Sequence, residues 1–288
     1  MKKRLLGTVA LPAILAGTAM AADLPVKVRP LPLPRAVYNW AGFYAGLNVG
    51  GARGRSDATT TPSCADPAPP LSPYFCSLTF GGQANAVAIG AGGTGSMSGS
   101  AFTSGGQIGY NLQYGSVVYG VELDIESFRI RASRQAAGNY PVGIFIVNPA
   151  NLFTIASSVS TDWLFTARGR VGWAFGNALA YATGGLAVTD LSSTHFFVDN
   201  VNVVGSGIGS GAWTGSATKT GWTVGGGLEW AWSRDWSVKA EYLYLKFGSI
   251  GAAGTIFNPQ PPPGYANAIS TSTDLTAQVA RIGVNRRF

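Results

Sequence analysis

Between Trp163 and Phe175 the sequence alternates between two kinds of side chain. Bulky apolar residues occupy every second position, and Arg168, Arg170 and small or polar residues stand between them. Because successive side chains of a strand point to opposite faces, this segment predicts a strand with one apolar and one polar face. The same alternation is clear over 216–232 and 236–250.

Eight segments carry this strand patterning over about ten residues or more, the length typical of membrane-barrel strands. They are 40–55, 99–114, 117–134, 157–175, 178–197, 216–232, 236–250 and 273–288. An open sheet in lipid would leave backbone groups unpaired along its edges, so the first strand must pair with the last. The expected fold class is therefore all-β, an eight-stranded antiparallel transmembrane up-and-down β-barrel.

A soluble β-sandwich or lipocalin-like barrel would alternate in the same way. Two observations favour the membrane barrel. The polar faces consist mainly of Gly, Ala, Ser and Thr with isolated charges, which suits a narrow interior, and aromatic residues lie near strand ends, as in lipid-facing girdles. Charged residues make up only 11% of the chain, against about 25% in ordinary soluble proteins.

The predicted connections alternate between short and long. Tight turns are expected at 114–116, 176–177 and 233–235, and long loops at about 56–98, 135–156, 198–215 and 251–272. This asymmetry is typical of outer-membrane barrels, with the short turns and both chain termini in the periplasm. The long loops, rich in Gly, Ser, Thr and Asn, are the expected contact surface.

The N-terminus has the pattern of a secretory signal peptide over 1–21. A charged start is followed by an apolar core, Leu5–Ala16, and by the cleavage pattern Ala19-Met20-Ala21. The alternative, a membrane-spanning helix, needs about 20 apolar residues, which is more than this core offers. We expect a proline-rich periplasmic lead-in over 22–38 and the barrel domain over 39–288.

The polar faces place charges of both signs in the barrel interior. Eight strands leave a bore just wide enough for side chains, so unpaired charges there would be costly and a salt-bridge network is expected. Its predicted members are Glu122, Asp124, Glu126, Arg168, Arg170, Glu229, Lys239, Glu241 and Arg281. Two roles are open for the network: an ion pathway or gate, and a structural plug. The narrow bore favours the structural plug. We expect interior glycines to leave room for longer neighbours such as Arg168, Arg170 and Arg281, at positions 109, 172, 225, 227 and 283.

Cys64 and Cys76 are the only cysteines. In an exported protein they meet oxidising conditions, which favours a loop disulfide over a metal site, because the single histidine, His195, is far away in sequence. We expect no metal site, no cofactor and no catalytic residues. No dense Lys/Arg stripe is present, so a nucleic-acid partner is not expected either.

His195 supports one enzyme hypothesis, a lipid-modifying barrel that uses a histidine with a nearby Ser and Asp. Asp190, Ser192 and Ser193 lie close in sequence. Catalytic partners normally come from different elements, however, so clustering on one strand is a weak signal. We expect an ordinary surface histidine.

The chain resembles the small porin-like, or immunogenic, outer-membrane proteins of alphaproteobacteria, within the opacity-type group of eight-stranded barrels. The resemblance covers nearly the whole mature chain. It is carried by Ala21-Ala22-Asp23-Leu24-Pro25, Trp40-Ala41-Gly42-Phe43-Tyr44-Ala45-Gly46, Val121-Glu122-Leu123-Asp124, Ala240-Glu241-Tyr242-Leu243-Tyr244 and the ending Arg281-Ile282-Gly283-Val284-Asn285-Arg286-Arg287-Phe288. Arg286 departs from the family, which more often has an aromatic residue there, and the cysteine-bearing first loop is not a family feature.

The resemblance implies export through the general secretory pathway to the bacterial outer membrane. Phe288 resembles the signal that the barrel-assembly machinery recognises. Further partners implied are outer-membrane lipids, lipopolysaccharide, and host or environmental ligands of the loops. The implied role is structural and surface-interacting, with a small diffusion channel as the alternative and the lipid-modifying enzyme as a distant third.

Overall fold

The structure is a computed structural model that describes residues 38–76, 82–141, 152–201 and 208–288. These residues belong to one compact unit, 36–288. The predicted signal peptide and nearly all of the lead-in lie outside the described residues, so the domain boundaries stay predictions.

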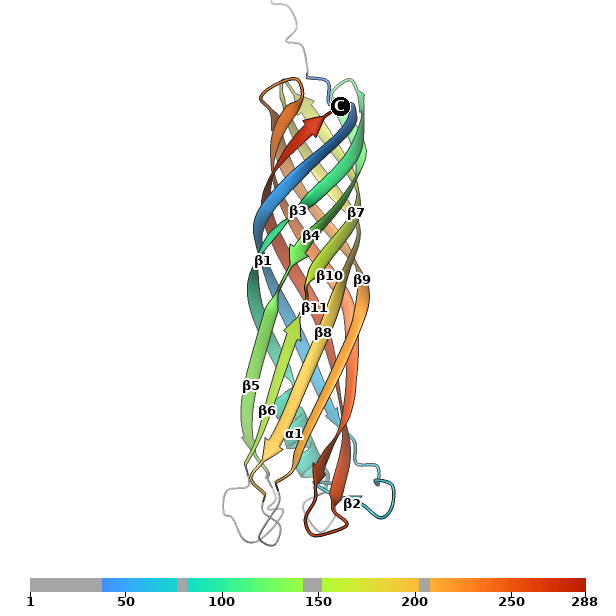
Figure 1. Cartoon of the computed structure of the whole chain (residues 1–288), viewed down its shortest axis with the longest axis vertical. Coiled ribbons are helices and arrows are strands. Elements are labelled where there is room, and N and C mark those ends of the chain that lie inside the picture. The colour runs from blue at the N-terminus through green and yellow to red at the C-terminus, as the bar shows by residue number, and fades with distance from the viewer. Residues whose placement is uncertain (1–37, 77–81, 142–151, 202–207) are drawn as a thin grey trace, which may run out of the picture. The chain divides into compact units, whose positions relative to one another are not determined.

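The described residues form long antiparallel strands and one helix (Figure 1). The elements are β1 (Gly42–Pro62), β2 (Ser72–Pro73), α1 (Gln83–Gly93), β3 (Gly95–Tyr114), β4 (Val117–Phe128), β5 (Arg131–Asn139), β6 (Leu152–Ser160), β7 (Trp163–Phe175), β8 (Ala178–Asp199), β9 (Ser210–Ala231), β10 (Trp236–Asn258) and β11 (Tyr265–Arg287). Eight of them close a ring in the order β1-β3-β4-β7-β8-β9-β10-β11, with β11 pairing β1 again. The all-β antiparallel barrel is thereby confirmed.

The prediction of eight strands in all is met only in part, because the described residues contain eleven. The predicted strands 117–134 and 157–175 are each interrupted once. At the interruption the amide of Ile130 bonds the Phe128 carbonyl oxygen at 2.9 Å and the amide of Thr161 bonds the Ile130 carbonyl oxygen at 3.1 Å. Beyond it, β5 pairs with β6 and β6 with β8. The short β2 pairs in parallel with β11.

The tight turns are confirmed, with Gly115 and Gly176 at φ +59° and +65°, a conformation that glycine adopts readily. The long loops are largely wrong. β1 continues to Pro62, β8 to Asp199 and β10 to Asn258, so strands fill much of what was assigned to loops. The misassigned stretches consist mainly of small and hydroxyl residues, in which alternation is hard to see. We call the two ends of the barrel the turn end and the loop end.

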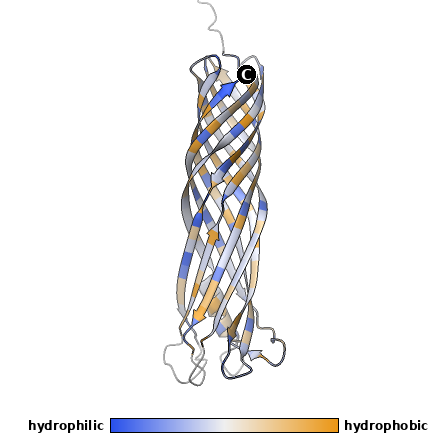
Figure 2. Cartoon of the chain, in the orientation of Figure 1, coloured by the Kyte–Doolittle hydropathy of each residue, from blue (hydrophilic) through white to orange (hydrophobic). Residues whose placement is uncertain are grey.

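The barrel wall reverses its polarity along its length. Near the turn end, the outward side chains are apolar and exposed, as at Leu47 and Leu228, while polar side chains point inward. Near the loop end, most outward side chains are polar or small, as at Ser216, although Phe196 is an exposed exception, and Phe128 and Leu191 are buried inside. Figure 2 colours the strands by hydropathy. We call the apolar outward zone the apolar belt.

Aromatic pairs mark the two edges of the apolar belt. Trp222 lies 5.6 Å from Tyr244, and Trp232 lies 6.2 Å from Trp236, measured between ring centroids. Trp222 lies on β9 and Trp232 directly follows its end, ten residues further along the chain. A strand crosses a membrane in about 9–11 residues, so the belt has the height of a bilayer and the loop end extends well beyond it.

Candidate functional site

The nine charged side chains predicted for the interior all point inward and are buried. They come from β4, β7, β9, β10 and β11, which surround the same level of the barrel. The structure brings them together in one cluster, which we call the charge network. Four cations face five carboxylates in it.

Arg168 lies at the centre of the charge network. Its Nη2 contacts Asp124 Oδ2 at 2.8 Å and also pairs with Glu122, and its Nη1 contacts Glu241 Oε1 at 3.0 Å. Its Nε donates to Thr166 Oγ1 at 2.9 Å. Each guanidinium nitrogen thus has an acceptor, which offsets the cost of taking the charge out of water.

Arg281 and Lys239 extend these contacts across the bore. Arg281 reaches Asp124 Oδ1 at 3.0 Å, Glu126 Oε2 at 3.2 Å and Glu241 Oε2 at 2.6 Å. Lys239 Nζ donates to both oxygens of Glu122 at 2.9 Å. The charges are thus linked from one wall of the barrel to the other.

Two tyrosines that the sequence analysis missed complete the charge network. Arg170 lies between the rings of Tyr44 and Tyr181, at 5.4 and 4.5 Å from their centroids, and pairs with Glu229 at 2.8 Å. The Tyr44 hydroxyl donates to Glu122 at 2.7 Å, and that of Tyr181 donates to Glu241 at 2.9 Å. The alternation that places Phe43 outward and Tyr44 inward was the available signal.

Two of the interior glycines make room for these tyrosines. A Cβ at Gly109 would lie 2.3 Å from the Tyr44 ring, and one at Gly227 would lie 2.7 Å from the Tyr181 hydroxyl. At these two positions the longer neighbours are tyrosines rather than the arginines that we gave as examples. The two glycines admit the aromatic rings that in turn hold Arg170.

Apolar side chains close the barrel on both sides of the charge network. At the turn end, Trp40 is buried in a cluster with Val118 and Leu179. Toward the loop end, a larger cluster fills the interior around Phe128 and Leu245. Buried side chains of the described residues thus occupy the interior at successive levels.

Helix α1 fills the loop end, where it contacts β1, β5 and β6 (Figure 1). Its Ile89 is fully buried in a cluster with Phe153 and Ile256. The sequence analysis placed this segment in a loop, because Gly and Ala provide little helical periodicity. The helix is held by its surroundings rather than by a strong local signal.

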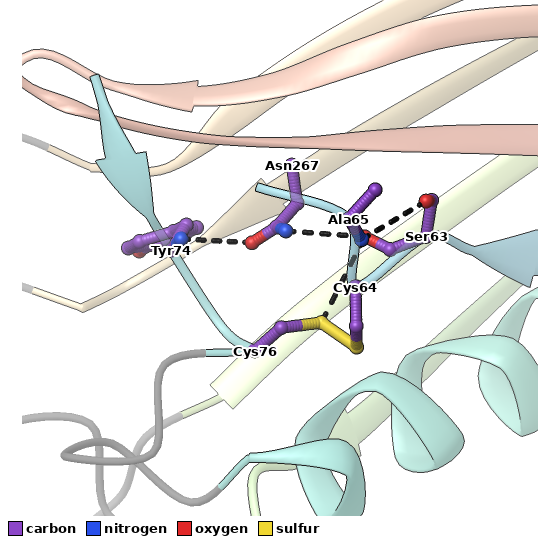
Figure 3. Close-up of a disulfide and its surroundings, with 6 residues drawn as sticks. All are labelled: Ser63, Cys64, Ala65, Tyr74, Cys76 and Asn267. Carbon is purple, nitrogen blue, oxygen red and sulfur yellow. Dashed lines mark hydrogen bonds between the residues drawn. A yellow bond between two sulfur atoms is a disulfide. The ribbon is translucent and has the colours of Figure 1, made fainter. Parts of the chain in front are cut away.

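The predicted disulfide between Cys64 and Cys76 is present (Figure 3). Beside it, the amide of Tyr74 donates to Asn267 Oδ1 at 2.8 Å, and Asn267 Nδ2 donates to the Ser63 carbonyl oxygen at 3.1 Å. Asn267 belongs to β11, so these contacts bind the first connection to the barrel wall.

A buried carboxylate joins three connections at the loop end. Asp199 Oδ2 accepts hydrogen bonds from the hydroxyls of Tyr74 and Tyr140 at 2.7 and 2.8 Å. Its Oδ1 accepts from the backbone amides of Gly209 and Val201 at 2.8 and 3.2 Å. Burial raises the pKa of Asp199, and the four donors oppose that rise. These partners converge only in the folded chain, so no local motif could reveal them.

The expectation that His195 lies on the surface is wrong. Its side chain points inward and is fully buried, with its ring 5.6 Å from that of Trp213 and Nδ1 2.9 Å from Ser157 Oγ. Burial lowers the pKa of His195 to about 4. The period of the strand explains the error, because odd-numbered residues of β8 point inward.

The acid and hydroxyl groups considered with His195 do not assemble around it. Asp190 lies on the outward face and accepts hydrogen bonds from the amides of Asp162 and Trp163, at 2.9 and 3.2 Å. Ser192 is also on the outward face, and Ser193 points inward. Asp190 and His195 therefore lie on opposite sides of the barrel wall, which separates the acid of a triad from its base.

Within the described ranges, no group of three or more His, Cys, Asp or Glu side chains is arranged to hold a metal ion. Among the same residues, no helix has the length and hydropathy needed to cross a membrane.

Comparison with known proteins gives one family and several distant relatives. The model of the "Outer membrane protein beta-barrel domain" family matches residues 9–288. A 31 kDa outer-membrane immunogenic protein of Brucella melitensis is 29% identical over 252 residues, 86% of this chain and 88% of that protein. A 25 kDa outer-membrane immunogenic protein of Brucella abortus is 22% identical, covering 94% of this chain and 91% of that protein. The outer membrane protein OprG of Pseudomonas aeruginosa aligns with a TM-score of 0.38 at 11% identity, covering 86% and 97%.

Proposed function

Since the chain belongs to the outer membrane protein β-barrel domain family, we propose that it is a sealed barrel with a structural and surface-interaction role. It resides in the bacterial outer membrane. In this proposal the eight strands of the ring cross the membrane through the apolar belt, and the loop end stands outside the cell. The protein carries out no enzymatic reaction.

One observation carries the sealed state, the filling of the interior at successive levels. Trp40 closes the turn end, the charge network follows, and the cluster around Phe128 and helix α1 fill the rest. The buried charges have lost their hydration water and are stabilised only by pairing with one another. A solute that passed through the bore would have to break these ion pairs, which is strongly unfavourable. This favours the structural role over the diffusion channel.

In this proposal the loop end is the surface that faces the outside of the cell. Its strands carry polar side chains such as Ser216 and Thr218 beyond the apolar belt. The relatives named as immunogenic proteins support a role for this chain as a surface antigen. Ligands from the host or environment would meet this extended wall as well as the loop tips.

We also propose that Phe288 is the signal read by the barrel-assembly machinery. It lies at the turn end with 76% of its surface exposed. The guanidinium of Arg286 lies 5.5 Å from the Phe288 ring and 5.9 Å from the Trp236 ring. Arg286 therefore contributes to the aromatic edge of the belt, which accounts for an arginine where the family more often has an aromatic.

Single-channel recording in planar bilayers tests the sealed barrel. Purified protein, shown to migrate in its heat-modifiable form, is reconstituted and held at a range of voltages. We expect no reproducible open steps, because the charge network and the apolar clusters occupy the bore at successive levels. Regular open steps of a single size would contradict the proposal and favour the small diffusion channel.

A further inference from the structure

Exposed cations gather on one side of the barrel, just beyond the apolar belt. Arg53 and Arg55 point outward from β1, and Lys246 points outward from β10. Arg129 and Arg131 are exposed at the junction of β4 and β5, beyond the serines of β3. We call these five residues the basic band.

The register fixes the level of the basic band against the belt. Arg53 pairs with Gln278 on β11, which pairs with Tyr244 on β10. Tyr244 belongs to the aromatic edge of the belt, and Arg55 and Lys246 lie one outward position further along their strands. Aromatic edges lie at the level of lipid headgroups, so the basic band does too.

A groove lies within the basic band. It has a volume of about 490 Å³, and its lining includes Arg53, Arg55, Ser98, Tyr244 and Thr276. Guanidinium groups bind phosphate oxygens with paired hydrogen bonds, and neighbouring hydroxyls add donors. The groove therefore presents the donors that a phosphate group needs.

The acidic groups near the basic band leave its charge positive. Asp57 and Asp274 are the outward carboxylates beside it on β1 and β11. Asp162 and Asp190 face outward next to the β4–β5 junction, so five cations stand against four carboxylates. Asp57 pairs with Arg55 at 3.4 Å, with both side chains more than half exposed. An exposed pair of this kind is weak, so a phosphate can compete for Arg55.

We propose that the basic band binds the phosphate groups of lipopolysaccharide in the outer leaflet. The lipid portion lies against the apolar belt, its phosphates enter the groove, and Arg53 and Arg55 bind them. This inference rests on the proposed orientation, in which the loop end faces outward. It assigns a lipid site to one side of the barrel.

Binding measurements in neutral detergent micelles test the site. Refolded, heat-modifiable protein is titrated with bisphosphorylated lipid A, with dephosphorylated lipid A and with inorganic phosphate. The double variant Arg53→Gln/Arg55→Gln removes the two guanidinium groups. The control variant Arg234→Gln/Arg286→Gln removes the same charge from the turn end.

We expect the first double variant to bind bisphosphorylated lipid A about tenfold more weakly or worse, because it loses charge-assisted hydrogen bonds. The control variant should match the wild type, and dephosphorylated lipid A should bind both variants alike. Equal losses in the two variants, or no preference for the phosphorylated lipid, would overturn the site. Full competition by micromolar inorganic phosphate would show a free-anion site and overturn the lipid assignment.

Fractionation separates this inference from the proposed function. If the wild type is found heat-modifiable in the outer membrane but shows no phosphate preference, only the lipid site fails. If it is absent from the outer membrane, the proposed function fails as well.

Discussion

At the scale of single residues, each buried charge of the interior is stabilised by its oppositely charged partners. Arg168 contacts Glu122, Asp124 and Glu241, and all four side chains are buried. Removing one member of such a cluster leaves its partners charged in a medium that solvates them poorly. Removing one member therefore lowers the free energy of unfolding by more than the ion pair itself contributed to it.

We predict that Arg168→Met lowers the free energy of unfolding by about 3–5 kcal/mol, since three carboxylates lose their shared partner. The matched change Arg55→Met, at a largely exposed arginine, should change it by about 0.5 kcal/mol or less. Urea unfolding of both variants in lipid vesicles measures the difference. Equal stability of the two variants would mean that the charge network is not stabilising.

His195 gives the barrel a dependence on pH outside the membrane-spanning zone. Its pKa is about 4 in the folded chain, below its ordinary value of 6.5. Between pH 4 and pH 6.5, His195 is protonated in the unfolded chain and neutral in the folded chain. Stability from this group is therefore complete above pH 6.5 and falls as the pH drops toward 4.

We predict that His195→Gln removes this part of the pH dependence. The wild type should lose up to about 3 kcal/mol more than the variant between pH 6.5 and 4, as the pKa difference dictates. Urea unfolding at several pH values, with the two proteins compared at each, measures it. Parallel stability curves would contradict the burial of His195.

The charged residues of the interior could be placed from the sequence, because the period of two determines on which face of its strand each residue lies. Their individual partners could not. Tyr44 and Tyr181 contact Arg170 across the bore, and such pairings depend on barrel closure rather than on spacing. His195 was misplaced although the period of two that turns Tyr181 inward on β8 also turns His195 inward.

At the scale of elements, the strands are longer than the membrane requires. β9 runs from Ser210 to Ala231, and only its second half carries apolar outward residues. Toward the loop end from Trp222, the outward positions of β9 are Thr and Ser except for Ala212, and the large apolar residue Trp213 points inward. A period of two continues through this reversal, so the sequence pattern marked the strand but not its full length.

We predict that Ser216→Cys and Leu228→Cys, both outward on β9, differ in their access to water. On intact cells a membrane-impermeant maleimide should label Ser216→Cys and leave Leu228→Cys unlabelled, because lipid covers the second. The native cysteines are joined in a disulfide and give no background. Labelling of both positions, or of neither, would contradict the placement of the belt.

The elements that escaped the sequence analysis have weak local signals. Helix α1 is rich in Gly and Ala, and β5 and β6 are separated from β4 and β7 only by short irregularities. The position of α1 follows from the space inside the loop end, and those of β5 and β6 follow from their pairing with each other and with β8. No stretch of sequence specifies either alone.

At the scale of the whole molecule, one end of the barrel faces lipid and the other faces water, and the two ends differ in which face of the wall is apolar. In the apolar belt, lipid outside requires apolar outward residues, and the bore holds paired charges. At the loop end, water outside requires polar outward residues, and the interior becomes an apolar core with α1 in it. Fold class, ring order and tight turns were predictable because they follow from alternation and closure, whereas the reversal depends on which solvent each segment meets.

A gel of outer membranes from cells expressing the full-length gene, run with and without boiling, tests the closed membrane barrel most directly. A closed barrel resists detergent until it is heated, so the unboiled protein should migrate differently from the boiled protein. We predict that shift, in the outer-membrane fraction. A soluble periplasmic protein with no shift would contradict the account, since its apolar belt would then need a covering other than lipid.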